Sequence, residues 1–92
     1  MKNATDVRNM LKEQYDAEIV DEMSLFDGPA FAEAIIGVTT TNVVVYDFDK
    51  MVQCLVDEDG MTAEEAAEFI EYNTVRTLPY MTNPPIIMYP VM

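Results

Sequence analysis

The stretch from residue 43 to residue 73 constrains the fold more than any other, because it combines a buried-strand pattern with two sets of helix signals. Residues 43–46 form an apolar run rich in valine, which is typical of a strand covered on both faces. Asp47 follows this run and supplies a side-chain oxygen for the free amides of a helix start. The sequence therefore predicts a strand that leads directly into a helix.

Two helices are expected after this strand. The apolar stripe of the first comprises Phe48, Met51, Val52, Leu55 and Val56. Gly60 can end that helix in the left-handed conformation, and Thr62 with Glu65 matches a capping box, with Met61 and Ala66 placed as a hydrophobic staple. The face of the second helix expected against the strands comprises Ala63, Ala66, Phe69, Ile70 and, as its last member, Asn73. Helices joined so closely fold back on each other or meet at a sharp angle.

The N-terminal third is less regular. Val7, Met10, Leu11 and Tyr15 recur at helical spacing and predict a helix of about three turns. The acidic segment 16–28 is expected to be a loop or a short extended piece. Residues 29–36 carry both helix-favouring alanines and strand-favouring residues, and we interpret residues 31–39 as a strand with Ala32, Ala34, Ile36 and Val38 on one face.

Prolines are expected to set the boundaries of the C-terminal elements. Pro79 is expected to stop the second helix, and residues 83–85 (Asn-Pro-Pro) to form a stiff connector. Residues 86–89 then form a third strand, which its flanking prolines place at a sheet edge. The predicted fold is α+β: one domain, residues 1–92, in the order α-β-β-α-α-β, with helices packed on a three-stranded sheet whose first two strands are antiparallel.

Charge and composition limit the classes of function. Seventeen acidic residues against five basic ones give a formal charge of −12, which argues against binding nucleic acid directly or an anionic membrane surface. It favours a basic protein partner, or solubility alone. Cys54 is the single cysteine and histidine is absent, so an internal disulfide, a zinc cluster and an imidazole base are excluded and no cofactor or metal is expected. We expect a cytoplasmic protein without a secretory signal or a membrane span.

The acids of the second predicted helix are its most informative chemical feature. Glu64, Glu68 and Glu71 recur at i, i+4 and i+7, with Glu65 beside them, and Asp57, Glu58 and Asp59 precede the helix. One interpretation is a solvated face that keeps a small domain soluble. The other is a surface that mimics the phosphates of a nucleic acid and occupies the basic groove of a nucleic-acid-binding protein.

Other chemistries find less support. An EF-hand loop with its glycine at Gly60 would begin at Leu55 and close at Ala66, and neither residue can ligate calcium. Cys54 lacks an activating histidine, and nearby acids should raise its pKa, so a packed thiol is expected. Lys50 and Arg76 are isolated cations expected to pair with nearby acids. A carboxylate-dependent hydrolase would need two acids facing one pocket.

The C-terminal end gathers aromatic and sulfur-containing side chains: Tyr72, Tyr80, Met81, Met88, Tyr89 and Met92. Core packing explains such a group, and an exposed surface for dimerisation or docking is the alternative.

The segment VVVYDFDKMVQCLVDEDGMTAEEAAEFIEYNTVRTLPYM resembles a pattern found in small uncharacterised proteins of bacteriophages, prophages and other mobile elements, in which a VYDYxK strand-to-helix step precedes a DGMSxEEAxEFxEYN helix. The resemblance covers about two-fifths of the chain, central and C-terminal, and transfers no catalytic residue. It implies a bacterial host cell, and small acidic proteins of this kind often inhibit host defence nucleases or DNA-binding regulators.

The sequence therefore favours a non-enzymatic binding protein of the anti-defence kind, such as a DNA mimic or an anti-CRISPR protein, that occupies a basic protein surface. Its expected partner-binding residues are Asp57, Glu58, Asp59, Glu64, Glu65, Glu68 and Glu71. The alternative is a structural or assembly component that forms a homodimer or docks through the apolar C-terminal end, with residues 86–92 required.

Overall fold

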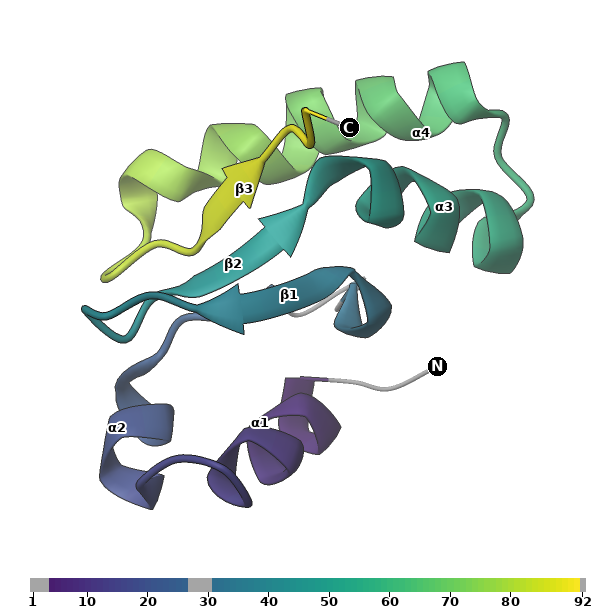
Figure 1. Cartoon of the computed structure of the whole chain (residues 1–92). Coiled ribbons are helices and arrows are strands. Elements are labelled where there is room, and N and C mark those ends of the chain that lie inside the picture. Colours follow the sequence, from purple (N-terminus) through teal and green to yellow (C-terminus); the bar gives the residue numbers. More distant parts are fainter. Residues whose placement is uncertain (1–3, 27–30, 92) are drawn as a thin grey trace.

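The strand β2 (Val44–Asp47) is the centre of a three-stranded sheet in the order β1-β2-β3 (Figure 1). In this computed structural model, which describes residues 4–26 and 31–91, β1 (Ile35–Val38) pairs with β2 antiparallel and β3 (Ile86–Met88) pairs with β2 parallel. The α+β class, the antiparallel first pair and the edge position of the third strand are thus confirmed.

The hairpin between β1 and β2 is closed by hydrogen bonds of one threonine. The Thr39 hydroxyl oxygen accepts from the amides of Thr41 and Val43 at 3.2 and 3.1 Å. Asn42 has a φ of 65°, in the left-handed region that asparagine tolerates better than most residues. This local chemistry fixes the turn between β1 and β2.

The two helices expected after β2 are both present. Asp47 caps α3 (Phe48–Asp59) by accepting from the Lys50 amide at 3.1 Å, and Gly60 ends it with a φ of 68°. The short connection then leads to α4 (Ala63–Phe69), which Thr62 caps. In Figure 1 the two helices fold back on each other beyond the end of β2, as the sequence predicts.

The helical path does not end at α4. A π-helical turn, η2 (Ile70–Thr74), and a 3₁₀ helix, η3 (Val75–Tyr80), continue it. The prediction that Pro79 stops the helix is therefore wrong. In an α-helix the Pro79 ring would clash with the carbonyl of residue 75, and the chain has already changed to 3₁₀ geometry at that residue.

The wide turn of η2 also changes which residues are buried. Ala66, Ile70 and Thr74 are buried at a constant spacing of four residues. Ala63 and Asn73, both expected to face the strands, are exposed instead. A π-helical turn holds more than four residues, so it moves the buried face one position past Asn73.

Two helices lie in the N-terminal third. The predicted helix is α1 (Ala4–Lys12), which buries Val7 and Leu11 but ends before the exposed Tyr15. A second helix, α2 (Ala17–Glu22), occupies part of the segment expected to be a loop, so that prediction is wrong for these residues, while residues 27 and 28 lie outside the described chain.

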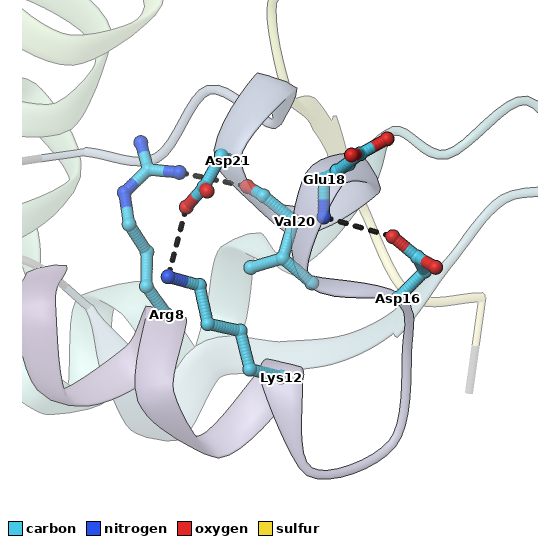
Figure 2. Close-up of polar contacts among 6 residues, drawn as sticks. All are labelled: Arg8, Lys12, Asp16, Glu18, Val20 and Asp21. Atoms are coloured by element: carbon cyan, nitrogen blue, oxygen red, sulfur yellow. Dashed lines mark hydrogen bonds and ion pairs between the residues drawn. The ribbon is translucent and has the colours of Figure 1, made fainter.

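Polar contacts explain why α2 forms although it is only six residues long (Figure 2). Asp16 caps it by accepting from the Glu18 amide at 2.9 Å. From α1, Arg8 donates to the Val20 carbonyl oxygen at 2.8 Å, and Lys12 pairs with Asp21 at 2.9 Å. Val20 is fully buried between these contacts and ties α2 to the core.

The strand expected over residues 31–39 begins later than predicted. Phe31 adopts a left-handed conformation with a φ of 51°, and a 3₁₀ turn, η1 (Ala32–Ala34), follows it. Ala32 and Ala34 are buried, whereas Ile36 is 45% exposed, because the turn and a bulge between Ile35 and Gly37 break the expected alternation. Residues 29 and 30 lie outside the described chain.

One core joins these elements. Its fully buried large side chains are Tyr46, Phe31, Met51, Leu55, Ile70, Val7, Val20 and Val44. Phe26 contacts both Phe31 and Tyr46, with ring centroids 6.2 and 4.8 Å apart. Burial of these apolar side chains is the main stabilising contribution and holds α3 and α4 against the sheet. Among the described residues, no helix has the length and apolar character that a membrane crossing requires.

Candidate acidic interface

The seven acids expected to bind a partner are all exposed and lie on the α3–α4 hairpin and its continuation into η2. Asp57, Glu58 and Asp59 form the last turn of α3. Glu64, Glu65 and Glu68 belong to α4, and Glu71 lies in η2. These acids therefore sit on helices that are anchored by buried residues, rather than on a loose loop.

The three acids at the end of α3 occupy an electrostatically unfavourable place. The carboxyl end of a helix carries the negative end of its dipole, which favours cations, and α3 has no basic residue in its last turn. Gln53 donates to an Asp57 carboxylate oxygen at 2.7 Å and orients this side chain along the helix surface. Helix stability alone does not account for three acids at this position.

The acids at the start of α4 have the opposite relation to the helix dipole. Glu65 accepts from the Thr62 amide at 3.1 Å, and the Glu65 amide donates to the Thr62 hydroxyl at 3.1 Å, which completes the predicted capping box. The backbone hydrogen bond from Thr62 lowers the pKa of Glu65 below its ordinary value. Glu65 is therefore ionised and held in place at neutral pH.

No lysine or arginine pairs with any of the seven acids in the part of the chain that the structure describes. Arg8 and Lys12 are engaged with α2, as Figure 2 shows. Arg76, expected to pair with an acid, instead lies over the Tyr72 ring, 4.9 Å from its centroid. Lys50 was also expected to pair with an acid, but it forms no ion pair with a described residue. The hairpin acids thus form no ion pair with a described basic residue, and Lys50 lies in a pocket that Asp57 and Glu58 also line.

A shallow groove of about 320 Å³, largely open to solvent, lies along α4 and η2. Its lining residues are Met61, Glu65, Glu68, Phe69, Tyr72 and Asn73. The structure thus brings Glu65 and Glu68 together beside apolar side chains, while the other five acids lie outside this groove. The sequence assigned Phe69 and Asn73 to the buried face and Tyr72 to the C-terminal group. The spacing 61, 65, 68–69 and 72–73 is the helical signal that could have revealed a shared stripe.

A second pocket, of about 170 Å³, has Cys54 in its lining. Its other lining residues are Glu33, Lys50, Gln53, Asp57 and Glu58. Burial raises the pKa of Cys54, and the negative charges of Glu33, Glu58 and Asp57 raise it further. Cys54 is buried, as expected, and it is held as a neutral thiol, which is a poor nucleophile.

The described residues include no group of three or more histidine, cysteine, aspartate or glutamate side chains arranged to hold a metal ion. At the surface the acids of the hairpin present negative charge and hydrogen-bond acceptors.

The C-terminal tyrosines are exposed rather than packed in the core. Tyr72, Tyr80 and Tyr89 are 61%, 91% and 62% exposed, although the Tyr89 ring also contacts that of Phe48 at 4.8 Å. Met81 and Met88 are half-buried, and Met92 lies outside the described chain. Residues 72–92 contain no acidic side chain, so this end differs sharply in charge from the α3–α4 hairpin.

Comparison of this chain with protein-family models, with curated proteins and with solved structures found no match.

Proposed function

We propose that this protein is a non-enzymatic binding protein that uses the acids of the α3–α4 hairpin to occupy a basic surface of another protein. The observation that carries the proposal is the exposure of Asp57, Glu58, Asp59, Glu64, Glu65, Glu68 and Glu71 on anchored helices, with no basic side chain of the described chain paired to them. Uncompensated charge of one sign attracts a partner of the other sign over a long range.

The arrangement of the acids supports binding more than stability. Three acids lie at the helix end where the dipole disfavours them, and Glu64 and Glu68 are like charges one turn apart, which repel each other. A basic surface brought against the hairpin would relieve both effects. Because α3 and α4 are already ordered, association would carry only a small entropic penalty for ordering the backbone.

The partner we propose is a nucleic-acid-binding protein of a bacterial host cell, such as a defence nuclease, whose basic groove the hairpin would block. Two arguments support this choice. Regularly placed carboxylates on a helix present charge as a nucleic-acid backbone does, and the resemblance to mobile-element proteins favours a bacterial setting, in which such an inhibitor would be useful. The cytoplasm of the host is the corresponding proposed location.

The test is capture from a bacterial lysate with the tagged protein, washed at low and high salt. The proposal expects one nucleic-acid-binding protein that is released by high salt and displaced by DNA or RNA. Reversing Glu64, Glu68 and Glu71 to lysine should abolish capture. The matched control reverses Glu13, Glu18 and Glu22, which makes the same change in net charge at the other end of the chain. Equal capture by both triple variants would contradict the proposal.

A second candidate function is favoured by the exposure of Tyr80, Ile86, Tyr89 and Val91, which lie in a sequence segment without acids. Such a surface would suit a structural or assembly component that docks or dimerises by apolar contact. It expects association that persists at high salt and is lost in Tyr80→Ser, whose side chain is 91% exposed and makes little contribution to the fold. Retained association in that variant, or release by salt, would count against this candidate.

A further inference from the structure

The groove along α4 and η2 combines three features in one place: an apolar floor, an aromatic ring and two carboxylates. We propose that this groove receives an arginine side chain of the basic partner and that this arginine anchors the complex. The inference rests on the proposed function and makes it specific. It names arginine as the residue type that is recognised. It also assigns direct contacts to Glu65 and Glu68, whereas the other five acids contribute only long-range charge.

The floor fits the aliphatic part of an arginine side chain. Met61 and Phe69 are half-buried and pack against the core, so their positions are fixed while one side of each remains accessible from the groove. Long basic side chains bury their methylene stems along apolar surface and keep the charged head at its edge. A groove of about 320 Å³ with such a floor offers this contact, which a bare acidic surface does not.

The rim fits the charged head. Glu65 and Glu68 both line the groove, one helical turn apart. Glu65 is held by its hydrogen bond with the Thr62 amide through one carboxylate oxygen, which leaves the other oxygen available to an incoming donor. Because the capping box already orders this side chain, a guanidinium that binds it has a smaller entropic penalty than one that binds a mobile surface glutamate.

The ring favours arginine over lysine. Arg76 of this chain lies 4.9 Å from the centroid of Tyr72, so one face of the ring already stacks with a guanidinium, and a partner arginine would displace Arg76 or stack on the opposite face. A planar guanidinium stacks on an aromatic face and donates to carboxylates at the same time, whereas an ammonium group acts as a compact, strongly hydrated charge. Tyr72 is 61% exposed and lines the groove, so a partner can reach it.

The test is a titration of the ¹⁵N-labelled protein with the capped tripeptide acetyl-Gly-Arg-Gly-amide, followed by backbone amide shifts. The same measurement is made with the lysine and citrulline tripeptides. The arginine peptide should shift mainly the amides of residues 61, 65, 68, 69, 72 and 73, and should bind about three- to ten-fold more tightly than the lysine peptide. The uncharged citrulline peptide should not bind measurably.

Variants make the test specific to the groove. Tyr72→Ala should reduce arginine binding to the lysine level, and Tyr72→Phe should restore the preference, because the ring and not the hydroxyl stacks. Tyr80→Ala is the matched control, since Tyr80 is exposed but lies outside the groove, and should leave both affinities unchanged. Glu68→Gln should weaken both peptides.

Equal affinity for arginine and lysine peptides, with shifts spread over both acidic helices, would overturn the arginine groove and leave the proposed acidic function standing. The absence of any shift in the groove residues at low salt would overturn it as well. Failure of the proposed function is a different result, namely that the captured partner is indifferent to reversal of Glu64, Glu68 and Glu71.

Discussion

Thr62 and Glu65 each donate a backbone amide to the other's side chain, at 3.1 Å in both directions. This exchange has two consequences. It satisfies amides that the first turn of α4 would otherwise leave without partners, and it fixes a carboxylate at the edge of the groove. One local motif thus serves both the fold and the proposed interface.

We expect Thr62→Ala to lower the free energy of unfolding by about 1 kcal/mol, because the helix loses its side-chain cap. Thr62→Ser retains the hydroxyl oxygen and should remain close to the parent protein. Urea denaturation followed by circular dichroism measures both variants. A Thr62→Ala variant as stable as the parent would show that the cap contributes nothing in solution.

Lowering the pH should weaken the capping box. The pKa of Glu65 is lowered in the folded protein, so its contribution to stability is present above the unfolded value of about 4.3 and is lost as the pH falls through the lower folded value. NMR titration of the Glu65 carboxyl carbon measures the folded value directly. In Thr62→Ala that pKa should rise only in part, since the side-chain hydrogen bond of Thr62 is lost while the larger effect, the hydrogen bond from the backbone amide of residue 62, is retained. An identical titration in both proteins would remove the Thr62 side chain as a cause of the shift.

Cys54 should react slowly with thiol reagents in the folded protein, since it is buried and its pKa is raised. We expect alkylation by iodoacetamide at pH 8 to be at least about ten-fold slower than in the urea-unfolded chain. Glu58→Gln removes one of the negative charges that raise this pKa, so thiolate absorbance near 240 nm should appear at lower pH in that variant. A thiolate that forms at the same pH in both proteins would remove Glu58 as a cause.

Two isoleucines test the packing of the helical continuation. Ile70 is fully buried at the start of η2, so Ile70→Ala should lower the free energy of unfolding by about 2–5 kcal/mol through lost burial and a residual cavity. Ile36 is 45% exposed on β1, and the same substitution there should have a much smaller effect. Denaturant titration compares them. Similar losses at both sites would mean that the core does not extend into η2.

Repulsion among the acids should be measurable as a change in the melting temperature Tm. Glu68→Gln removes one charge of the like-charged pair Glu64 and Glu68 and leaves the acids of the first turn of α4 in place, so it should raise Tm by about 1–3 °C at low salt. The gain should disappear at high salt, where the parent protein is stabilised by screening. Glu13→Gln is the control outside the hairpin. Scanning calorimetry at two salt concentrations provides the comparison, and a salt-independent gain would point to another cause.

The sequence predicted those elements whose signals are local. Asp47, Gly60 and the Thr62–Glu65 pair act within one turn of the chain, and all four have the predicted structural role. Glu64, Glu68 and Glu71 are exposed, which agrees with their helical spacing of i, i+4 and i+7 along one strip. Helix-capping rules were sufficient for the capping residues, because the free amides and carbonyls of a helix end find their hydrogen-bond partners within the same few residues.

Elements that depend on distant contacts were missed. The helix α2 is six residues long, too short for a periodic pattern, and contacts from Arg8 and Lys12 on α1 hold it. Phe31 has a positive φ that no phenylalanine favours on its own, and its burial against the core compensates. The signal available for α2 was Asp16, a side-chain cap at its start.

The groove was missed for a related reason. Its apolar members were assigned to the core or to the C-terminal group, because hydrophobicity alone does not tell a buried side chain from a half-buried one. The π-helical turn that places Asn73 on the groove and Thr74 in the core has no sequence pattern that we recognise.

The parallel pairing of β2 with β3 makes the acidic hairpin a crossover connection between two neighbouring strands. During synthesis on the ribosome, both helices of the hairpin emerge before β3, because α4 ends at Phe69 and β3 begins at Ile86. The parallel pair of β2 and β3 is therefore the last part of the sheet that can form. A slow step in pairing β3 would delay completion of the sheet without delaying the formation of the helices.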